Sequence, residues 1–476
     1  MSNKALIQTD ICIIGAGSGG LSVAAGASQM GADVVLIEKS AMGGDCLNTG
    51  CVPSKAILAA GHAAQTMRDA SAFGIKSGEP EVDWEKVHAH IHNVIGAIAP
   101  NDSVERFEGL GVNVIQASAS FVDNQTVQAG DVQVRAKYFV IATGSSAFVP
   151  PIEGINDVPY YTNENIFDKK ESVEHLIVIG GGPIGMELAQ AHRRLGATVT
   201  VIEVAKLLAK DDPELTRVVI DHLHGEGITL HDQASDIKIE KVAQGIGITY
   251  QHNGDTAYTN GSHLLVATGR KANVDGLNLE AAGINYSPRG IEVDKRLRSS
   301  NKHVFAIGDV AGPYQFTHMA AYQAGIIIRN ILFKMPAKVD YSAVPWVTYT
   351  DPELAHVGLS EADAKAQGKD VRILRWSFAE NDRAQAERRT EGLVKVVTTA
   401  KGQILGASIV GLHAGELIQP WILAINQKMK IGTMASIIAP YPTLAEVNKR
   451  IAGSFYTEKL FSDGTKKLVR FLIRWF

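Results

Sequence analysis

Residues 43–55 read Gly43-Gly44-Asp45-Cys46-Leu47-Asn48-Thr49-Gly50-Cys51-Val52-Pro53-Ser54-Lys55 and hold two of the three cysteines of the 476-residue chain. On a regular helix, Cα atoms five residues apart are about 8–9 Å apart, whereas those of a disulfide are roughly 4.4–6.8 Å apart. A bond between Cys46 and Cys51 would therefore need a distorted turn, and Gly50 offers the backbone freedom for one. Pro53 suits a first helical turn, so Cys51 is expected at a helix N-terminus, which lowers the pKa of a thiol. Such a dithiol suits redox chemistry, and two unrelated buried cysteines or half of a metal site are the alternatives.

A glycine-rich turn between an apolar strand and a helix occurs twice. The first copy is Gly15-Ala16-Gly17-Ser18-Gly19-Gly20, preceded by a strand at 9–14 and followed by a helix to about residue 30 and a strand that ends on Glu38. The second is Gly180-Gly181-Gly182-Pro183-Ile184-Gly185, and its second strand ends on Glu203. In both copies the acid lies 23 residues after the first glycine. This is the dinucleotide fingerprint, in which glycines admit a pyrophosphate at a helix N-terminus and the acid binds a ribose.

Composition limits the other possibilities. The formal net charge of −4 argues against a general nucleic-acid binder. The first ten residues lack the apolar core of a signal peptide, and no apolar run is long enough for a membrane span. The few cysteines fit a reducing cytoplasm, and Cys12, inside the first strand, is expected to be a core residue.

The motif at 43–55 resembles the redox-active motif of the class I pyridine nucleotide–disulfide oxidoreductases, flavoenzymes that include dihydrolipoyl dehydrogenase, glutathione reductase and mercuric reductase. The resemblance extends from about Thr9 to about Gly453. It implies an α/β fold with two Rossmann-like domains, for FAD and NAD(P), and a C-terminal α+β dimerisation domain. The expected boundaries are 1–149 and 274–340 for the FAD domain, 150–273 for the NAD(P) domain, 341–460 for the dimerisation domain and 461–476 for a tail.

The resemblance also implies roles for individual residues. NADH would pass electrons through FAD to a Cys46–Cys51 disulfide and on to a small-molecule acceptor. Cys51 would face the flavin, Cys46 would meet the substrate, and Lys55 would pair with Glu187 near the flavin. Besides these, the residues expected to contact the cofactors are Gly15, Gly17, Ser18, Gly20, Glu38, Lys39, Gly44, Asp45, Ala119, Thr143, Gly144, Gly180, Gly182, Ile184, Gly185, Glu203, Gly269, Gly308, Asp309 and His318.

Several of these residues have plainer alternatives. Asp309 resembles the family's ligand for the ribityl chain, but an aspartate after an apolar strand is also an ordinary turn residue. His318 opens a helix whose N-terminal amides would face the flavin, and it can equally be an ordinary residue of that helix. Glu203 favours NADH, because a carboxylate repels a 2′-phosphate, although Lys206 is close and a solvated acid is the alternative.

One position departs from the family's dithiol reductases, where a His-Pro supplies the acid–base catalyst and a glutamate follows five residues later. Here the glutamate is Glu446 and the histidine is replaced by Tyr441. Tyrosine, with a pKa near 10, exchanges protons poorly at neutral pH, so weak activity on lipoamide or glutathione disulfide is expected. A tyrosine here resembles mercuric reductases, which deliver the metal through a further cysteine pair near the C-terminus. No cysteine follows Cys51 in this chain, so efficient mercuric reduction is not expected. No residue is predicted to be a ligand of a resident metal.

The last residues predict a short basic amphipathic helix. Its apolar residues follow helical spacing and its basic residues fall on another side; they are Leu468, Phe471, Leu472, Trp475 and Phe476, and Lys467, Arg470 and Arg474. Such a helix can lie on an anionic membrane or pack against the body or the partner subunit, and packing is favoured. The predicted location is cytoplasmic, with membrane association as an option.

The predicted function is therefore an NADH-dependent FAD disulfide oxidoreductase, homodimeric, with an unidentified acceptor. NADPH is the less favoured cofactor. Dihydrolipoyl dehydrogenase is the first alternative, and mercuric-reductase-like metal reduction or a membrane-docked redox partner is the next. In the C-terminal domain, strands are expected at 344–353 and 392–398, and a helix at 415–429.

Overall fold

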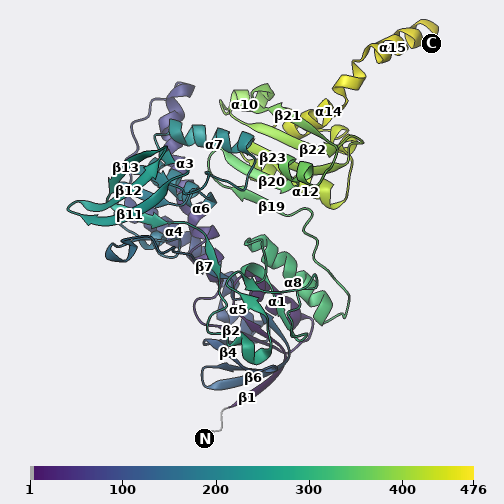
Figure 1. Ribbon diagram of the computed structural model, residues 1–476. Helices are drawn as coiled ribbons and strands as arrows, with labels where there is room; N and C mark the ends of the chain where they lie inside the picture. Colours follow the sequence, from purple (N-terminus) through teal and green to yellow (C-terminus); the bar gives the residue numbers. More distant parts are fainter. Residues whose placement is uncertain (1–4) are drawn as a thin grey trace. The chain divides into compact units, whose positions relative to one another are not determined.

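The computed structural model describes residues 5–476, which form two compact units (Figure 1). The first comprises the chain up to Val204 together with His231–Val339. The second comprises Ala205–Leu230 and Asp340–Phe476. Both combine sheets with helices, which confirms the predicted α/β class.

The first unit contains a seven-stranded sheet whose centre is parallel. Its order is β3-β2-β1-β6, with β18 also beside β6 and the antiparallel β5 and β4 continuing past β6. The strands are β1 (Leu6–Ile14), β2 (Val34–Glu38), β3 (Val112–Gln116), β4 (Ala119–Asp123), β5 (Thr126–Ala129), β6 (Val132–Ile141) and β18 (Val304–Ala306).

Strand β1 is apolar throughout its second half because both faces of the sheet are covered. Ile11 and Ile13 face a core that α1 (Ser18–Gln29) and α8 (Thr317–Ile331) complete. Cys12 faces the opposite core and is fully buried, as the sequence predicts. A strand buried on both faces reads as a continuous apolar run instead of an alternating one.

The second glycine-rich copy builds a smaller parallel sheet in the same unit. Its order is β9-β8-β14, with β10 beside β9, and an antiparallel sheet of β11, β12 and β13 follows in the chain. The elements are β8 (His175–Ile179), α6 (Pro183–Arg194), β9 (Thr198–Ile202), β10 (Thr229–His231), β11 (Ser235–Val242), β12 (Gly245–His252), β13 (Asp255–Gly261) and β14 (His263–Val266). Strands β7 (Ser145–Ala147) and β15 (Arg270–Ala272) pair antiparallel, as do β16 (Tyr286–Ser287) and β17 (Gly290–Ile291).

Two helices connect the copies within the first unit. Helix α3 (Cys51–Asp69) packs on α6, and Gly61 allows the approach, because a Cβ there would lie 3.3 Å from the carbonyl oxygen of Ala191. The other helices of this region are α2 (Gly44–Asn48), α4 (Trp84–Ile98) and α5 (Val104–Gly109).

The second unit is a five-stranded antiparallel sheet with helices. Its order is β19-β20-β23-β22-β21. The elements are α7 (Pro213–Gly225), β19 (Pro345–Thr348), β20 (Glu353–Gly358), α9 (Glu361–Ala366), β21 (Val371–Ser377), α10 (Asp382–Ala386), β22 (Leu393–Thr399), β23 (Ile404–Gly411), α11 (Ala414–Leu417), α12 (Gln419–Asn426), α13 (Ile431–Ala435), α14 (Glu446–Leu460) and α15 (Asp463–Trp475).

Two predicted elements of this unit are divided in the structure. The strand expected at 344–353 is two strands separated by a turn, since Pro352 has no N–H for a ladder and its carbonyl accepts the Thr350 hydroxyl at 2.9 Å. The helix expected at 415–429 is α11 and α12, because Pro420 lies in the first turn of a new helix.

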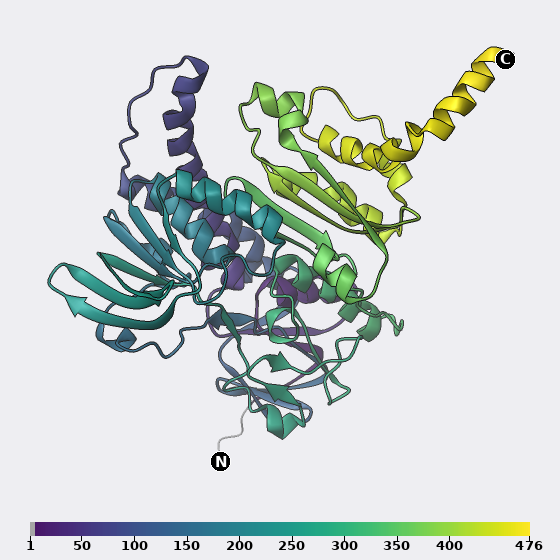
Figure 2. The ribbon, with the colours of Figure 1, turned by 45° about the horizontal axis from the view of Figure 1, so that its top comes forward.

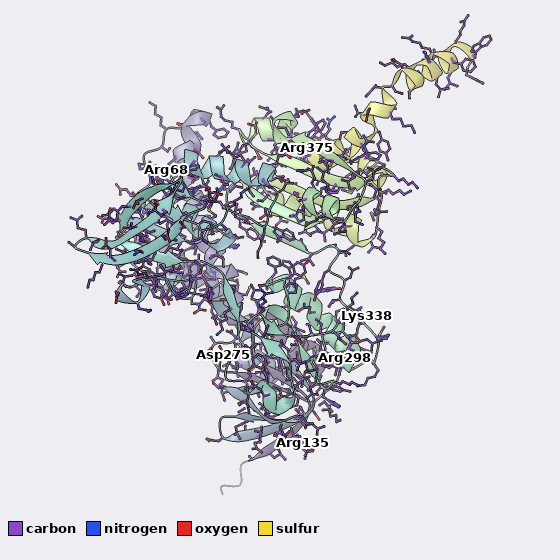
Figure 3. All side chains as sticks on the ribbon, viewed as in Figure 1. Arg68, Arg135, Asp275, Arg298, Lys338 and Arg375 are labelled. Carbon is purple, nitrogen blue, oxygen red and sulfur yellow. The ribbon has the colours of Figure 1, made fainter. Side chains whose placement is uncertain are left out.

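A buried lysine ties α7 to the sheet of the second unit. The side chain of Lys395, on β22, is only 5% exposed, and its Nζ lies 2.6 Å from Asp212, 2.9 Å from Glu214 and 2.8 Å from Glu361. Arg375, labelled in Figure 3, also binds Glu214. Lys365 and then Lys395 lower the pKa of Glu361 to about 2. The segment between β9 and β10 is therefore held in the second unit by a cluster of charges.

Helix α15 follows α14 in the last part of the chain (Figure 2). The Ser462 side chain accepts the Thr465 N–H at 3.3 Å and so begins a new helix. None of its residues is buried. Within residues 5–476, no helix has both the length and the apolar character needed to cross a membrane.

Candidate functional site

The first glycine-rich turn leaves a helix N-terminus open to a ligand. Gly15 has φ +104°, and a Cβ on it would overlap the carbonyl oxygen of Ala142. A Cβ on Gly20 would overlap the carbonyl oxygen of Gly15. At Gly17, in contrast, a Cβ would meet nothing within 4 Å, and α1 begins there without a side-chain cap. The first N–H groups of α1 therefore face open space of the kind that a pyrophosphate fills.

The second turn repeats this geometry. Gly180 has φ +117° beside the carbonyl of Ala267, and a Cβ on Gly185 would overlap the carbonyl oxygen of Gly180. Gly182 again has open space where a Cβ would be, and α6 begins with Pro183 in its first turn. The residues of both turns thus fit a dinucleotide.

The two acids lie at equivalent places. Glu38 Oε2 accepts the N–H of Ala16 at 2.6 Å, and Glu203 Oε2 accepts the N–H of Gly181 at 2.6 Å. Each carboxylate is therefore held beside its own phosphate loop at the end of its strand, where an adenosine ribose would lie. Lys39, which follows Glu38, is exposed.

The cysteine segment has the predicted break. Cys46 lies in α2, Cys51 begins α3, and Gly50 separates the two helices with φ −124° and ψ −109°. A Cβ on Gly50 would lie 2.7 Å from a carboxylate oxygen of Asp45. Both thiols are free, and they are hydrogen-bonded to each other. The bend thus brings together two sulfur atoms that a regular helix would keep apart.

The surroundings of the pair make the two thiols unequal. The hydrogen bond from Cys46, with smaller contributions from Thr317 and Lys55, outweighs burial and lowers the pKa of Cys51 to about 6. The same hydrogen bond and burial raise the pKa of Cys46. Cys51 Sγ lies 3.4 Å from the hydroxyl of Thr317, the first residue of α8. Cys51 therefore carries the negative charge of the reduced pair, and Cys46 keeps its proton.

Lys55 and Glu187 connect the cysteine helix to the second dinucleotide fold. Lys55 Nζ lies 2.9 Å from Glu187 Oε2, and the glutamate side chain is only 7% exposed. Lys55 is on α3, one turn after Cys51, and Glu187 is on α6. The pair fixes α3 against α6 with its positive charge on the thiol side.

A second polar group surrounds Asp309, which follows β18. Its Oδ2 accepts the Ser145 hydroxyl at 2.5 Å, and the Nε of Arg270 is 3.8 Å away. Burial raises the pKa of Asp309, although the Ser145 bond opposes this. Arg270 Nη2 also lies 3.2 Å from Asp45, which itself accepts a hydrogen bond from Asn163. Thus Asp309 and Asp45, 264 residues apart in the sequence, share one arginine.

The remaining predicted cofactor residues lie at element ends of the first unit. Thr143 donates to the carbonyl of Asn273 at 2.7 Å, and Gly308 N–H donates to Gln323 at 2.7 Å. His318 stacks on Phe316 with ring centroids 5.2 Å apart. The others are Ser18 and Ile184 in the first turns of α1 and α6, Gly44 at the start of α2, Ala119 at the start of β4, and Gly144 and Gly269 after β6 and β14.

Three functional candidates were not predicted from the sequence, namely Thr317, Arg270 and Asn163. Each reaches the cysteine segment from more than 100 residues away. Their only signal in the sequence is position, since Thr317 directly precedes His318, where a helix is predicted to begin, and Arg270 directly follows the predicted cofactor residue Gly269.

Tyr441 and Glu446 lie in the second unit. The Tyr441 hydroxyl donates to Asp382 at 3.0 Å, and the residue is 68% exposed. The neighbouring Asp382 raises the pKa of Tyr441. Glu446 begins α14, where Arg450 lies 3.6 Å from its carboxylate. Tyr441 is therefore a hydrogen-bond donor at neutral pH and a poor base.

Comparison with known proteins identifies the family. Residues 9–324 match the model of the pyridine nucleotide-disulphide oxidoreductases, and residues 344–452 match the dimerisation domain of the same family. The chain belongs to this family. A mercuric reductase from Staphylococcus aureus is 34% identical over 449 residues, which cover 94% of this chain and 82% of the relative. A dihydrolipoyl dehydrogenase from Geobacillus stearothermophilus is 35% identical, covering 93% and 95% respectively.

Solved structures agree with this assignment. LpdA from Mycobacterium tuberculosis superposes with a TM-score of 0.86 at 25% identity, covering 94% of this chain and 99% of its own. The protein is thus a flavoprotein disulfide oxidoreductase of the pyridine nucleotide-disulphide oxidoreductase family, which uses FAD and a nicotinamide dinucleotide. The matched dimerisation domain indicates a homodimer, and α15 lies beyond the matched residues.

Proposed function

We propose that the protein is an NADH-dependent disulfide oxidoreductase in which Cys46 and Cys51 alternate between disulfide and dithiol. The observation that carries this proposal is the environment of Cys51. This thiol begins a helix, contacts the Thr317 hydroxyl at 3.4 Å and lies near Lys55. All three features stabilise a thiolate, which is the form that exchanges with a disulfide.

The two phosphate loops would hold different cofactors. The first loop, which leads directly into the cysteine segment, would hold FAD together with Glu38 and Asp309, and the second would hold NADH with Glu203. FAD supplies, when bound, a two-electron carrier between a nicotinamide dinucleotide and a dithiol. Glu203 supports NADH over NADPH, because its carboxylate accepts hydrogen bonds from a 2′-hydroxyl and repels a 2′-phosphate.

The two thiols would have different roles at the acceptor, in keeping with their different pKa values. Cys46 gives up its proton and attacks an acceptor disulfide, which breaks the acceptor S–S bond. One acceptor sulfur leaves and takes up a proton as a thiol, and the other stays bound to Cys46 as a mixed disulfide. The Cys51 thiolate then attacks the sulfur of Cys46, which releases the second thiol and restores the Cys46–Cys51 bond. The acceptor receives two electrons and two protons in this exchange; one proton comes from Cys46 and the other from solvent, because Cys51 reacts as a thiolate.

The proton of Cys46 needs a base, and Tyr441 is a poor one. Its hydroxyl already donates to Asp382, and its pKa is raised. We therefore propose weak turnover with dihydrolipoamide, although dihydrolipoyl dehydrogenases are among the relatives. A second candidate acceptor is a metal ion. Two thiolates can bind a metal ion directly, so no proton has to pass from Cys46 to the acceptor. The relatives named mercuric reductase favour this candidate.

The decisive experiment is dihydrolipoamide oxidation by NAD⁺ with the purified holoenzyme. A missing general base costs about 10²–10⁴-fold, so wild type should turn over far below ordinary enzyme rates. Tyr441→His should gain activity, whereas Tyr441→Phe, which removes only the bond to Asp382, should not. Wild-type turnover at about 10 s⁻¹ or more, a typical enzyme rate, would instead establish the dihydrolipoyl dehydrogenase alternative.

The role of the dithiol is tested separately. In Cys46→Ser, NADH should still bleach the flavin absorbance, but no disulfide acceptor should be reduced. Disulfide reduction by this variant at the wild-type rate would refute the proposed exchange. The proposed location is the cytoplasm, with any membrane contact peripheral and confined to the tail.

A further inference from the structure

Helix α15 is amphipathic over its last three turns. At about 100° per residue, Lys466, Lys467, Arg470 and Arg474 fall within one narrow arc. The remaining arc of the last three turns is apolar; its residues are Leu468, Val469, Phe471, Leu472, Ile473, Trp475 and Phe476. Asp463 is the single acidic residue of the helix.

The second unit does not cover this apolar face. Phe471 is 54% exposed, Trp475 is 66% exposed and Phe476 is fully exposed. In Figure 3 the side chains of α15 project around the yellow helix with no other segment of this unit beside them. Leu460 and Phe461, at the end of the preceding helix α14, are also exposed. A contiguous exposed apolar patch on a folded chain marks a contact site for a membrane or for another protein.

The charges on the helix distinguish between possible occupants. The chain as a whole has a formal net charge of −4, yet four cations flank the apolar arc of this one helix. A second copy of the same helix would bring like charges together, whereas anionic phosphates would be attracted to them. The aromatic ring of Trp475, with the Arg474 guanidinium 5.9 Å from its centroid, suits the boundary between headgroups and acyl chains.

The length of the helix determines how it would bind. Its 13 residues span about 20 Å, less than the roughly 30 Å of a bilayer core. A short helix with a basic face and an aromatic-rich apolar face lies in the interface plane instead of crossing the membrane. We propose that α15 is a peripheral docking helix for anionic phospholipid, inserting its apolar arc below the headgroups while its four cations bind lipid phosphates.

This inference is independent of the proposed acceptor and is tested with the full holoenzyme. The wild-type dimer is mixed with vesicles of phosphatidylcholine alone or of phosphatidylcholine and phosphatidylglycerol in equal parts, and binding is read by flotation. Binding to the anionic vesicles only, weakened by added salt, is expected. Equal binding to both kinds of vesicle, or to neither, overturns the proposal.

Three variants locate the contact. Arg470→Glu/Arg474→Glu should weaken vesicle binding about tenfold or more, since each cation contributes separately at an anionic surface. Phe471→Asp should do the same through the apolar face. Lys302→Glu/Lys401→Glu, which changes two exposed lysines elsewhere, should bind as wild type does. If all three variants bind alike, α15 is not the contact.

The competing occupant, the partner subunit, is tested with the same preparations. Removal of residues 463–476 should abolish flotation and leave a dimer with unchanged flavin content and unchanged flavin reduction by NADH. A deletion variant that sediments as a monomer would show that the apolar arc belongs to the subunit interface, and it would overturn the membrane proposal.

Discussion

The two phosphate loops of the first unit have nearly the same backbone but lead to different structures. In each, the first glycine has a positive φ, and a Cβ on the last glycine, Gly20 or Gly185, would overlap the carbonyl oxygen of the first. In each, an N–H of the loop also donates to the carboxylate at the end of the next strand. After Glu38, however, the chain turns back on its own loop, and a Cβ on Gly44 would lie 2.7 Å from Gly17 Cα. After Glu203 the chain leaves for the second unit.

The two copies share the residues suited to binding a dinucleotide, but only the first is followed by the cysteine pair. Glycines and a carboxylate are enough to build a cradle for a dinucleotide, and they recur unchanged in both copies. The two neighbouring thiols occur only after the first loop, where the following segment returns to that loop and brings Cys46 and Cys51 near it. The segment after the second loop holds no cysteine and is instead attached to the C-terminal sheet.

The sharpest test adds the same methyl group to each loop. Gly20→Ala and Gly185→Ala make equivalent overlaps with a carbonyl oxygen. Gly20→Ala should yield protein without flavin, whereas Gly185→Ala should keep its flavin but be reduced by NADH on the order of a hundredfold more slowly, because charged hydrogen bonds to a pyrophosphate are each worth about 1.5–3 kcal/mol.

Flavin content by absorbance and stopped-flow reduction by NADH distinguish the two outcomes. Gly96→Ala in α4, where a Cβ meets nothing within 4 Å, is the control and should match wild type. Loss of flavin from Gly185→Ala would show that the assignment of the loops to the two cofactors is reversed.

The segment that follows the second loop is attached to the C-terminal sheet through Lys395, and a substitution there should break this attachment. Lys395→Met leaves Asp212, Glu214 and Glu361 without their shared cation, and a broken buried charge cluster typically costs about 3–5 kcal/mol of unfolding free energy. Urea unfolding followed by far-ultraviolet circular dichroism measures the loss. Arg375→Met removes a more exposed cation from the same cluster and should cost about 1 kcal/mol or less. Equal losses in the two variants would mean that Lys395 is not the centre of the cluster.

A smaller effect, on nucleotide binding, is expected for the glutamates at the ends of β2 and β9. Glu203→Ala should raise the KM for NADH about tenfold, as expected for one lost hydrogen bond to a charged group, and should lower the KM for NADPH. The corresponding Glu38→Ala should change flavin retention and leave the ratio of the two KM values unaltered. Steady-state kinetics with both nucleotides provide the measurement, and a wild-type preference for NADPH would contradict the role given to Glu203.

The smallest effect concerns the thiolate that only the first copy has. Thr317→Val removes a donor to Cys51 Sγ and should raise the pKa of Cys51 from about 6 by about one unit, the equivalent of one charged hydrogen bond. Because only the thiolate reacts, iodoacetamide alkylation of the reduced enzyme should reach half its maximal rate near pH 6 in wild type and near pH 7 in the variant.

Thr66→Val, the same substitution on helix α3, is the matched control for this experiment. The Thr66 hydroxyl donates to the carbonyl of His62 at 2.9 Å, about four turns along the helix from Cys51, so its loss should leave the alkylation profile unchanged. Identical profiles for Thr317→Val and wild type would exclude Thr317 from the stabilisation of the thiolate.

Sequence patterns predict the fold well wherever the determining residues are neighbours. Strand β2 ends at the predicted Glu38, β9 ends directly before the predicted Glu203, and α3 begins at Cys51 after a break at Gly50, because apolar runs, glycines and prolines act on their own segment. The patterns fail where a proline divides an apolar run. Val344 to Glu353 is therefore two strands, and Pro420 separates two helices that looked like one.

Contacts between distant segments are harder to predict. Thr317 reaches Cys51 across 266 residues, and Arg270 reaches Asp45 across 225, with no spacing rule that connects them. The partners of Lys395 could not be predicted either, since a single lysine in an apolar strand does not indicate that three carboxylates surround it. These partners come together through the arrangement of sheets, which a single sequence encodes only indirectly.

The placement of α7 has a consequence for dividing the protein into fragments. The chain passes between the two units three times, after Val204, Leu230 and Val339. A recombinant fragment that starts at residue 340 would keep the five-stranded sheet but lose Asp212 and Glu214, and of its three carboxylate partners Lys395 would keep only Glu361. The second unit is therefore not a portable module: to transplant it into another protein, an engineer would have to splice 205–230 in as well.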